Sequence, residues 1–397
     1  MSTLRLKHVC DVIDVRAGSH RPTLLAVSIH RGVVPREELT EDEPRADDLG
    51  MYRLCESGDI VLNRMRAFQG AVGMAPMRGL VSPDYLVLRP RQHALGRYLH
   101  YLFRSSEFVG QMVARLRGIG STDTGTVRTP RINAEDLLDI SVRLPPIDEQ
   151  RAIANYLDRE AAEIDSLIAA KEQLLALADE RLRAWTFEAL EGASASRVPL
   201  KAVARWVEGP GIMAHEFRET GIPLLRIRNL VGDTINLDGC GYVEPAMVAA
   251  RWRHLCVRAG ELLVSGSARS GSPVVVPVEA DGAVPYTGLI RIWSTTSRLE
   301  RDFLRLFLTS PQFEHHIDRL KTGVGLQHWG PYHLAQLRIP LPPRESQLAV
   351  AAAFRQEETW SAQIRHASTT QVQLLRERRV ALITSTVTGE LRVPVVA

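Results

Sequence analysis

A motif that occurs twice constrains the fold of this chain more than any other feature. Leu144-Pro145-Pro146 is followed by Gln150, and the pattern returns as Leu341-Pro342-Pro343 followed by Gln347. Proline disfavours helix in the residue before it and fits the first helical turn, so each motif predicts the start of a helix. Each motif leads into a long segment with helical spacing. The sequence therefore predicts an internal duplication, in which a globular part and a helix are both repeated.

The two globular parts repeat the same order of expected elements. In the first part, β-type runs occupy residues 58–62, 71–74 and 85–88, and one helix is expected over 97–116. In the second part, residues 260–264 match 58–62, and 289–292 match 85–88. These matches predict an α+β protein with two similar mixed α/β domains, separated by two long helices.

The long segments have the spacing of a coiled coil. Apolar residues of the first step by three or four, with Lys171 among them, and a helix of roughly 40 residues spans about 60 Å. The second stripe is weaker, with Gln371 near its middle. A long helix with a narrow stripe needs a partner, so we expect the two to pair antiparallel, with the globular parts at opposite ends. Two unrelated surface helices are the alternative. The expected seam residues are Ile153, Leu157, Ile164, Ile168, Leu175, Leu182 and Trp185, then Phe354, Trp360, Ile364, Leu375 and Leu382.

These features divide the chain into five expected segments. The first globular domain covers 1–146, the first helix 147–192, the second domain 193–343, the second helix 344–391 and a tail 392–397. At 397 residues, two domains of ordinary size are expected.

Charge and cysteine content narrow the class of protein. The helix from Asp148 to Glu188 has ten acidic and five basic residues, which gives it a net charge of −5. The whole chain has a net charge of +3, so the residues outside this helix carry a net charge of +8. Nearly all basic residues are arginine, which suits phosphate and guanine edges, although codon usage in a GC-rich genome gives the same bias. The four cysteines form no Cys-x-x-Cys pair, and no apolar run has the length of a signal peptide or membrane span. We expect reduced thiols and a cytoplasmic protein.

Motifs for common chemistry are missing from the sequence. There is no Gly-x-x-x-x-Gly-Lys-Ser/Thr loop for ATP and no Asn/Asp-Pro-Pro-Tyr/Phe motif of an amino-methyltransferase. His315 and His316 are adjacent on an expected helix and so point apart, which favours a solvated surface over a metal site. The carboxylates Asp84, Glu261 and Glu279 show no pairing pattern. We expect no catalysis and no metal; a nuclease with an unrecognised site is an enzymatic alternative.

Several segments resemble one known family. They are the two Leu-Pro-Pro…Gln motifs with their helices, residues 58–65 with 68–70 and 81–87, residues 322–325, and the ending 381–389. Together, in this order, they are similar to the specificity subunit of type I restriction–modification systems. The second copy departs in having Glu345-Ser346 where the first has Asp148-Glu149, and in the polar middle of its helix.

The resemblance implies a function without chemistry in this chain. Each globular part would be a target recognition domain for one half of a bipartite sequence in double-stranded DNA, and the helices would set the spacer between the halves. Two methyltransferase (modification) subunits would dock on the helices and methylate adenine with S-adenosylmethionine. A motor and nuclease (restriction) subunit would use ATP. This chain would hold no cofactor and contact no membrane. A coiled-coil adaptor between two proteins is the alternative.

Polar turns after matching strands are the candidate DNA contacts, because Arg binds phosphates and Arg, Asn, Gln, Ser and Tyr can bind base edges. Glycine loops offer backbone N–H groups to phosphate. An ordinary hairpin or a helix C-cap explains such turns and loops equally well. Arg226 and Arg228 are expected on one strand face. Tyr286 and Thr287 are expected to occupy the positions that Asp84 and Tyr85 have in the first domain. In the first domain the candidates are Asn63, Arg64, Arg66, Gln69, Tyr85, Gly120, Ser121, Thr122 and Arg128; in the second they are Arg226, Arg228, Ser265, Ser267, Arg269, Ser270, Tyr286, Thr287, Gln327 and His328.

Overall fold

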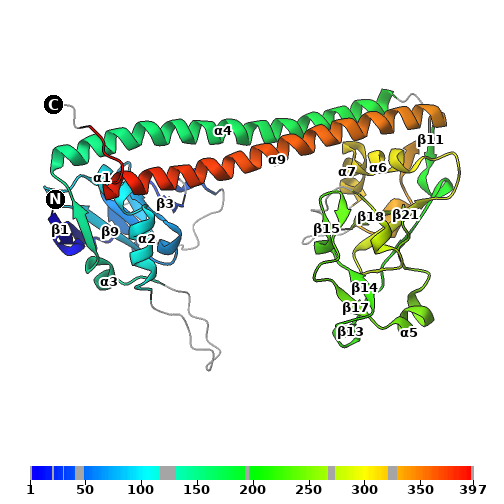
Figure 1. The fold of residues 1–397 in the computed structure, drawn as a ribbon, viewed down its shortest axis with the longest axis horizontal. Helices are drawn as coiled ribbons and strands as arrows, with labels where there is room; N and C mark the ends of the chain where they lie inside the picture. The colour runs from blue at the N-terminus through cyan, green and yellow to red at the C-terminus, as the bar shows by residue number, and fades with distance from the viewer. Residues whose placement is uncertain are drawn as a thin grey trace. The chain divides into compact units, whose positions relative to one another are not determined.

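The computed structural model describes residues 2–19, 22–29, 31–40, 49–116, 131–192, 196–266, 273–320 and 329–394. The chain forms two compact units (Figure 1). Unit 1 comprises Met1–Glu172 and Thr369–Ala397, and unit 2 comprises Gln173–Ser368. The division falls inside both long helices, so each unit contains one globular part and a portion of each helix.

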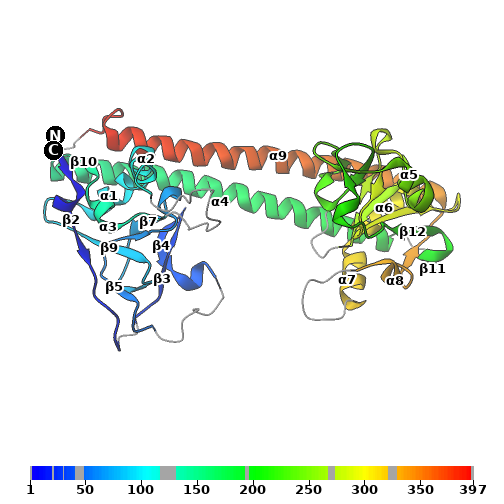
Figure 2. The same cartoon turned by 90° about the horizontal axis from the view of Figure 1, so that it is seen from below.

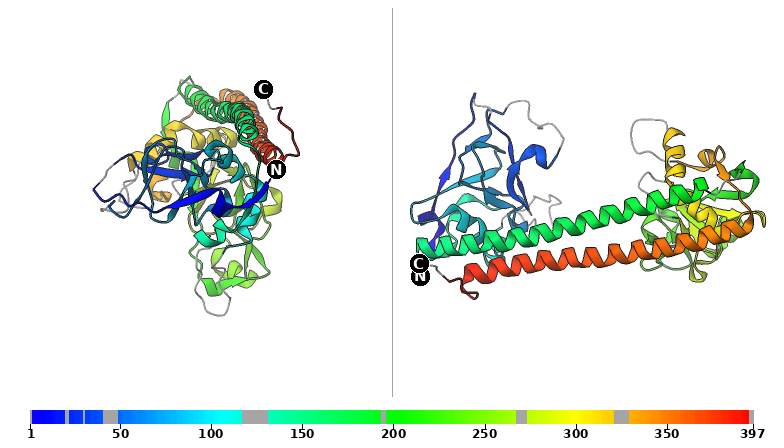
Figure 3. Two further views of the ribbon diagram at one scale, coloured as in Figure 1. Left: turned by 90° about the vertical axis from the view of Figure 1, so that its left-hand side faces the viewer. Right: turned by 90° about the horizontal axis from the view of Figure 1, so that it is seen from above.

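The two long helices begin directly after the repeated motif. Helix α4 (Ile147–Gly192) follows Pro146, and helix α9 (Arg344–Thr388) follows Pro343. In unit 1 they lie side by side in two perpendicular views (Figures 1 and 3), and Arg379 and Arg376 of α9 pair with Asp165 and Glu172 of α4 at 3.0 and 2.9 Å. The partner numbers fall along α9 as they rise along α4, which makes the pairing antiparallel.

The same antiparallel pairing occurs within unit 2. Arg365 of α9 contacts Asp179 of α4 at 2.8 Å, and Glu357 of α9 contacts Arg181 at 3.1 Å. Exposed ion pairs such as these contribute little stability each, so the buried stripe between the helices supplies most of the pairing energy.

Unit 1 is built on a four-stranded antiparallel sheet of order β2-β9-β6-β7, with α1 and α2 packed on it (Figure 2). Strand β1 pairs with β10, β3 with β4 and β5 with β8, all antiparallel. The strands are β1 (Ser2–Arg5), β2 (Cys10–Ile13), β3 (Leu25–Ser28), β4 (Gly32–Pro35), β5 (Arg53–Cys55), β6 (Ile60–Asn63), β7 (Val72–Met74), β8 (Gly79–Val81), β9 (Tyr85–Pro90) and β10 (Ser141–Leu144); the helices are α1 (Gly96–Leu102), α2 (Ser106–Val113) and α3 (Ala134–Leu138).

Unit 2 repeats this architecture with the order β12-β21-β18-β19 and adds a second sheet, β13-β17-β14-β20. Strand β11 pairs with β22 as β1 pairs with β10, and β15 pairs with β16. The strands are β11 (Arg197–Pro199), β12 (Ala204–Glu208), β13 (Phe217–Arg218), β14 (Ile222–Leu225), β15 (Leu230–Val231), β16 (Thr234–Ile235), β17 (Gly241–Val243), β18 (Leu262–Ser265), β19 (Val274–Val275), β20 (Val284–Pro285), β21 (Leu289–Ser294) and β22 (Arg338–Pro340); the helices are α5 (Pro245–Met247), α6 (Arg301–Thr309), α7 (Pro311–Leu320) and α8 (Pro331–Leu334).

The predicted fold class is confirmed, with two similar mixed α/β parts and two long helices. One detail of the prediction is wrong: the single helix over 97–116 is two helices, α1 and α2. Ser105 breaks them apart because its Oγ donates to Leu102 O at 2.7 Å and accepts from Phe108 N at 3.3 Å, which caps α2. Ser310 makes the same two bonds between α6 and α7.

The glutamine of each repeated motif explains why the motif exists. Gln150 is fully buried; its Oε1 accepts from Leu95 N at 2.8 Å, and its Nε2 donates to His93 O and Pro145 O at 2.9 and 2.8 Å. Gln347 makes the equivalent three bonds, to Glu300 N, Arg298 O and Pro342 O, each at 2.8 Å. Each glutamine thereby ties the start of a long helix to the loop before α1 or α6.

The seam of α9 differs from the apolar stripe expected from sequence. Its inward positions follow a heptad from Gln347 through Phe354, Ser361 and Ser368, all buried, to the half-buried Leu375 and Leu382. Trp360 is not a seam residue: it is 38% exposed, one position from Ser361, and its ring lies under the Arg181 guanidinium at 4.3 Å. The small serines leave no room for an indole there, and a search for apolar residues alone passes over them.

The side chains of the remaining expected seam residues are buried or half-buried. In α4, Ile153, Leu157 and Ile164 are buried, while Ile168, Leu175, Leu182 and Trp185 are half-buried, as is Ile364 in α9.

All four cysteines are free thiols; burial raises the pKa of Cys10 to about 12 and that of Cys55 to about 11. No helix in the described part of the chain is both long and apolar enough to cross a membrane.

Candidate nucleic-acid interface

The first candidate surface is the turn that follows β6 in unit 1. Asn63 pairs with Tyr85 across β6 and β9, and its Oδ1 accepts from Met65 N and Arg66 N at 3.1 and 3.3 Å. Gly70 closes the turn with a φ of 78°, a conformation that favours glycine. The exposed side chains of Arg66 and Gln69 project from this turn. Side-chain amide bonds and glycine therefore shape the backbone so that two polar side chains face solvent.

Arg64 has a structural role in this turn. Its Nε donates to Ile132 O at 3.0 Å and one terminal nitrogen donates to Asn133 Oδ1 at 2.9 Å. Ile132 N in turn donates to Arg64 O at 3.2 Å. Burial, followed by the nearby Arg131 and Arg53 charges, lowers the pKa of Arg64. Arg64 thus anchors residues 131–133 beside the turn with two of its five donors, and a DNA contact through the others stays a prediction.

Tertiary structure gathers more arginine here than the sequence indicated. Burial raises the pKa of Tyr85, and the charges of Arg66 and Arg36 act against that rise, which places both guanidinium groups near its phenol. Arg53 and Arg131 lie near Arg64 in the same way. Arg36 and Arg53 precede the turn by many residues, so no local sequence pattern could have assigned them to it. Arg53 is itself largely buried and pairs with Asp14 at 3.3 Å, so Arg66 and Arg131 are the exposed arginines of this group.

Unit 2 has an equivalent turn after β18. Ser265 ends the strand and is buried, and Gly266 N donates to Gly288 O at 2.8 Å. Trp329 N donates to Gly266 O at 2.8 Å, just as Ile132 N donates to Arg64 O in unit 1. A Cβ on Gly266 would lie 2.4 Å from Trp329 O, which explains the glycine. The first residue after each strand is therefore equivalent, and Gly266 takes the place of Arg64; residues 267–272 lie outside the described part of the chain.

The proposed match of Tyr286 and Thr287 with Asp84 and Tyr85 is wrong. Strand register aligns Leu289 with Tyr85, because Leu289 pairs with Ser265 as Tyr85 pairs with Asn63. The turn before each strand agrees, since Leu289 N donates to Tyr286 O as Tyr85 N donates to Ser82 O, both at 3.0 Å. Tyr286 therefore occupies the position of Ser82. The error arose from carrying the offset of one strand pair over to the next.

Arg226 and Arg228 do not share a strand face. Strand β14 ends at Leu225, and residues 227–229 form a 3₁₀ turn in which Asn229 Oδ1 accepts from Arg226 N at 2.9 Å. This side-chain bond competes with strand pairing and ends the strand. Arg228 is exposed and donates to Gly239 O at 2.9 Å. Arg226 is half-buried against aromatic rings, a position that strand alternation did not predict.

Strand pairing brings three sequence-distant candidates of unit 2 together. Tyr286 N donates to Leu225 O at 2.8 Å, so Tyr286 lies beside Arg226, and the Gly266–Gly288 bond adds the turn after β18. Glu208, which sequence analysis missed, accepts from Gly288 N at 2.9 Å and Thr287 Oγ1 at 3.3 Å.

Among the described residues no group of three His, Cys, Asp or Glu side chains could hold a metal ion. Nine candidates lie outside the described residues: Gly120, Ser121, Thr122, Arg128, Ser267, Arg269, Ser270, Gln327 and His328.

Comparisons with known proteins indicate which class of protein this chain is similar to. No protein-family model matches the chain. It is 20% identical over 285 residues to the type I restriction enzyme MjaVIII specificity subunit of Methanocaldococcus jannaschii, a match that covers 66% of this chain and 65% of that protein. A structure reported for complex assembly and conformational transition of the type I R-M system matches 98% of both chains, at 17% identity and a TM-score of 0.64. The HsdS subunit from Thermoanaerobacter tengcongensis matches 98% of this chain and 97% of its own at 18% identity, with a TM-score of 0.49.

The fold defines a duplicated α/β protein in which each copy runs into a long helix, and a component of a type I restriction–modification system shares that fold. The resemblance drawn from the repeated motifs is thereby confirmed: this chain is similar to the specificity subunits of type I restriction enzymes.

Proposed function

We propose that this chain is the DNA-recognition subunit of a type I restriction–modification complex. Each unit would contact one half of a bipartite target through the turn after β6 or β18, and the long helices would set the unread spacer. The observation that carries the proposal is a repeated anchor: in both units the first residue after β6 or β18 accepts the same backbone bond from the segment before α3 or α8. A duplicated surface suits two half-sites on one DNA molecule.

The charge around the first turn supports contact with DNA. Arg66 is exposed and has no ion pair or side-chain hydrogen bond with any described residue, while Arg36, Arg53 and Arg131 lie nearby. Arginine contacts to phosphates supply most of the sequence-independent affinity of DNA-binding proteins. A surface of this kind fits a polyanion such as DNA better than it fits an apolar protein partner.

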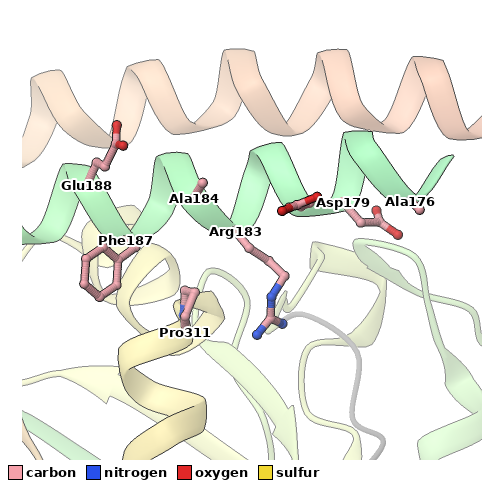
Figure 4. A pocket seen from close by; sticks show the side chains of 8 residues that line it. Ala176, Asp179, Arg183, Ala184, Phe187, Glu188 and Pro311 are labelled. Atoms are coloured by element: carbon pink, nitrogen blue, oxygen red, sulfur yellow. The ribbon is translucent and has the colours of Figure 1, made fainter. Parts of the chain in front are cut away.

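Exposed apolar side chains on the long helices support the docking of methyltransferase subunits. In unit 2 a hollow of about 550 Å³ lies between α4 and the start of α7, with Phe187 and Pro311 in its wall (Figure 4). In unit 1 a hollow of about 410 Å³ lies between Leu167 of α4 and Leu374 of α9. Exposed apolar patches mark protein–protein contacts.

Under this proposal the chain performs no catalysis and acts in the cytoplasm. S-adenosylmethionine would bind the methyltransferase subunits, and ATP would bind a motor and nuclease subunit if the system restricts DNA. The alternative is an adaptor that bridges two proteins through its coiled coil without contacting DNA.

Methylome sequencing tests the proposal directly. The strain that carries this chain, its deletion strain and a complemented strain would be compared for methylated adenine. The expected result is one bipartite motif that disappears with the deletion and returns with complementation. If no methylated motif depends on the chain, the proposal is wrong.

A charge reversal separates the proposal from the adaptor alternative. Arg66→Glu places negative charge on the proposed DNA surface, and methylation of the motif should fall strongly. Arg78→Glu is the matched control, because Arg78 is also exposed and lies at the other end of the β6–β7 hairpin, beside Glu56. Equal methylation in both variants would favour the adaptor. Arg64 is unsuitable for this test, since its substitution would also release residues 131–133.

A further inference from the structure

One arginine in unit 2 differs from the others that contact aromatic rings. In the described part of the chain, six arginines lie over a ring: Arg159, Arg181, Arg226, Arg251, Arg291 and Arg305. Five of them also pair with a carboxylate, namely Glu160, Glu357, Glu216, Glu261 and Glu358 in the same order. Arg226 has no carboxylate partner and no side-chain hydrogen bond to a described residue. Its positive charge is held in place, and none of the described carboxylates neutralises it.

Two aromatic rings hold the Arg226 guanidinium. Its central carbon lies 4.6 Å from the centre of the Phe217 ring and 5.7 Å from that of Tyr286, and the two rings meet edge to face at 6.3 Å. Such contacts attract a cation and fix the plane of the group. The Arg226 backbone is fixed as well, by the bond from its N–H to Asn229 Oδ1. The side chain is therefore preorganised, and little rotamer freedom is left to lose when a ligand binds.

The contacts of Arg226 leave its hydrogen-bonding capacity unused. Its Nε is buried without a hydrogen-bond partner. A buried donor on a charged group is costly to leave unpaired, and ring contacts offset only part of that cost. Its terminal nitrogens are not among the buried, unpartnered atoms, and they make no hydrogen bond to a described residue. A planar ligand with two adjacent acceptors would pair with these terminal nitrogens.

Position and chemistry together select the ligand. Arg226 lies beside Tyr286, because Tyr286 N donates to Leu225 O, and Gly288 bonds to Gly266 at the end of β18, where the proposed DNA surface of unit 2 begins. In double-stranded DNA, the O6 and N7 atoms of guanine form two adjacent acceptors in the major groove, and arginine binds them with two parallel hydrogen bonds. We propose that Arg226 is a specificity-determining residue that recognises a guanine in the half-site bound by unit 2. This inference rests on the proposed function and deepens it.

The test replaces atoms in the DNA, so it does not depend on a variant that folds poorly. Methylome sequencing first supplies the motif, and the purified complex with its methyltransferase subunits then binds duplexes carrying that motif. Each guanine of each half-site is replaced in turn by 7-deazaguanine, which lacks the N7 acceptor but keeps base pairing. One replacement in a single half-site should weaken binding by no more than about 5- to 150-fold, the range for a complete bidentate arginine–guanine contact, because the bond to O6 is kept.

The same panel with Arg226→Met assigns that contact. Methionine keeps an unbranched apolar stem but has no donor for N7 or O6, so the sensitive guanine should become insensitive to loss of N7. Arg253→Met, also exposed in unit 2 and not among the candidate DNA contacts, is the matched control and should keep the wild-type pattern. The inference is overturned if the sensitive guanine stays sensitive in Arg226→Met, or if no guanine is sensitive in the wild type. Uniform weakening on every duplex, with the guanine pattern unchanged, would assign Arg226 to a phosphate and also overturn it. Absence of any bipartite motif would instead refute the proposed function.

Discussion

The buried glutamine of the repeated motif permits a quantitative prediction. Gln347→Ala removes three hydrogen bonds that tie the start of α9 to the loop before α6. The bond to Pro342 O is buried, and losing it costs about 1 to 3 kcal/mol. The other two are half-buried, where water can partly replace the side chain, at about 0.5 to 1.5 kcal/mol each. The free energy of unfolding should fall by about 2 to 6 kcal/mol.

Tryptophan fluorescence measures this effect in the relevant part of the chain. All six tryptophans lie within unit 2, at Trp185, Trp206, Trp252, Trp293, Trp329 and Trp360. With a denaturant slope of about 2 kcal/mol per molar urea, the unfolding midpoint should fall by about 1 to 3 M. Gln363→Ala is the matched control: Gln363 is exposed on the same helix, and alanine is at least as good a helix former. Its midpoint should stay close to that of the wild type.

The result that refutes the reasoning is a Gln347→Ala midpoint no lower than that of Gln363→Ala. The burial and the three bonds would then contribute nothing measurable, and the repeated motif would need another explanation. Gln150→Ala provides an independent repeat in unit 1. The Leu95 amide donates to Gln150 in the wild type, so its hydrogen exchange should accelerate in this variant.

Three further predictions concern charges. Arg305→Ala removes a buried guanidinium and leaves the half-buried Glu358 without its two hydrogen bonds of 2.8 and 2.7 Å, so it should cost up to about 3 to 5 kcal/mol in urea unfolding followed by tryptophan fluorescence; a loss below that of Gln363→Ala would contradict this. Glu172 and Arg376 are half-exposed, so a double-mutant cycle with alanine at both positions, followed by thermal circular dichroism, should give a coupling of at most about 1 kcal/mol; a larger value would show that surface pairs hold the helices together. Burial, followed by the Arg104 and Arg379 charges, lowers the pKa of His100 to about 3. The unfolded chain therefore binds a proton that the folded chain does not, so the contribution of His100 is fully present above about pH 6.5 and is lost as the pH falls towards 3; an NMR titration of the imidazole that shows a pKa near 6.5 would contradict this.

Much of the fold could be predicted from local patterns. The duplication follows from Leu144-Pro145-Pro146 and its copy, and the ordered matches between residues 58–62 and 260–264 correspond to β6 and β18. Proline sterics and helical periodicity act over a few residues, so both can be predicted from the local sequence. The two errors in secondary structure arose where one side chain competes with the backbone: Ser105 caps a new helix, and Asn229 ends a strand.

The candidate site could be predicted only in part. The polar turn from Asn63 to Gln69 stands out because its residues are consecutive. Arg36 and Arg53 could not be added to it, because β-strand pairing rather than sequence proximity carries them there. The role of Arg64 was likewise hidden, since its partners Ile132 and Asn133 are far along the chain.

The sequence by itself determined the duplication and the positions of the two long helices, and its resemblance to a known family indicated the class of protein. The duplication and the helix positions depend on backbone sterics and on the spacing of apolar residues, which are local properties. Only the tertiary structure decided which arginines are free to bind a ligand. Arg64 is committed to the fold, and five ring-contacting arginines are neutralised by carboxylates, whereas Arg226 is held between two rings with its charge unpaired. Whether a charge is paired depends on distances of a few ångströms between side chains that only folding brings together.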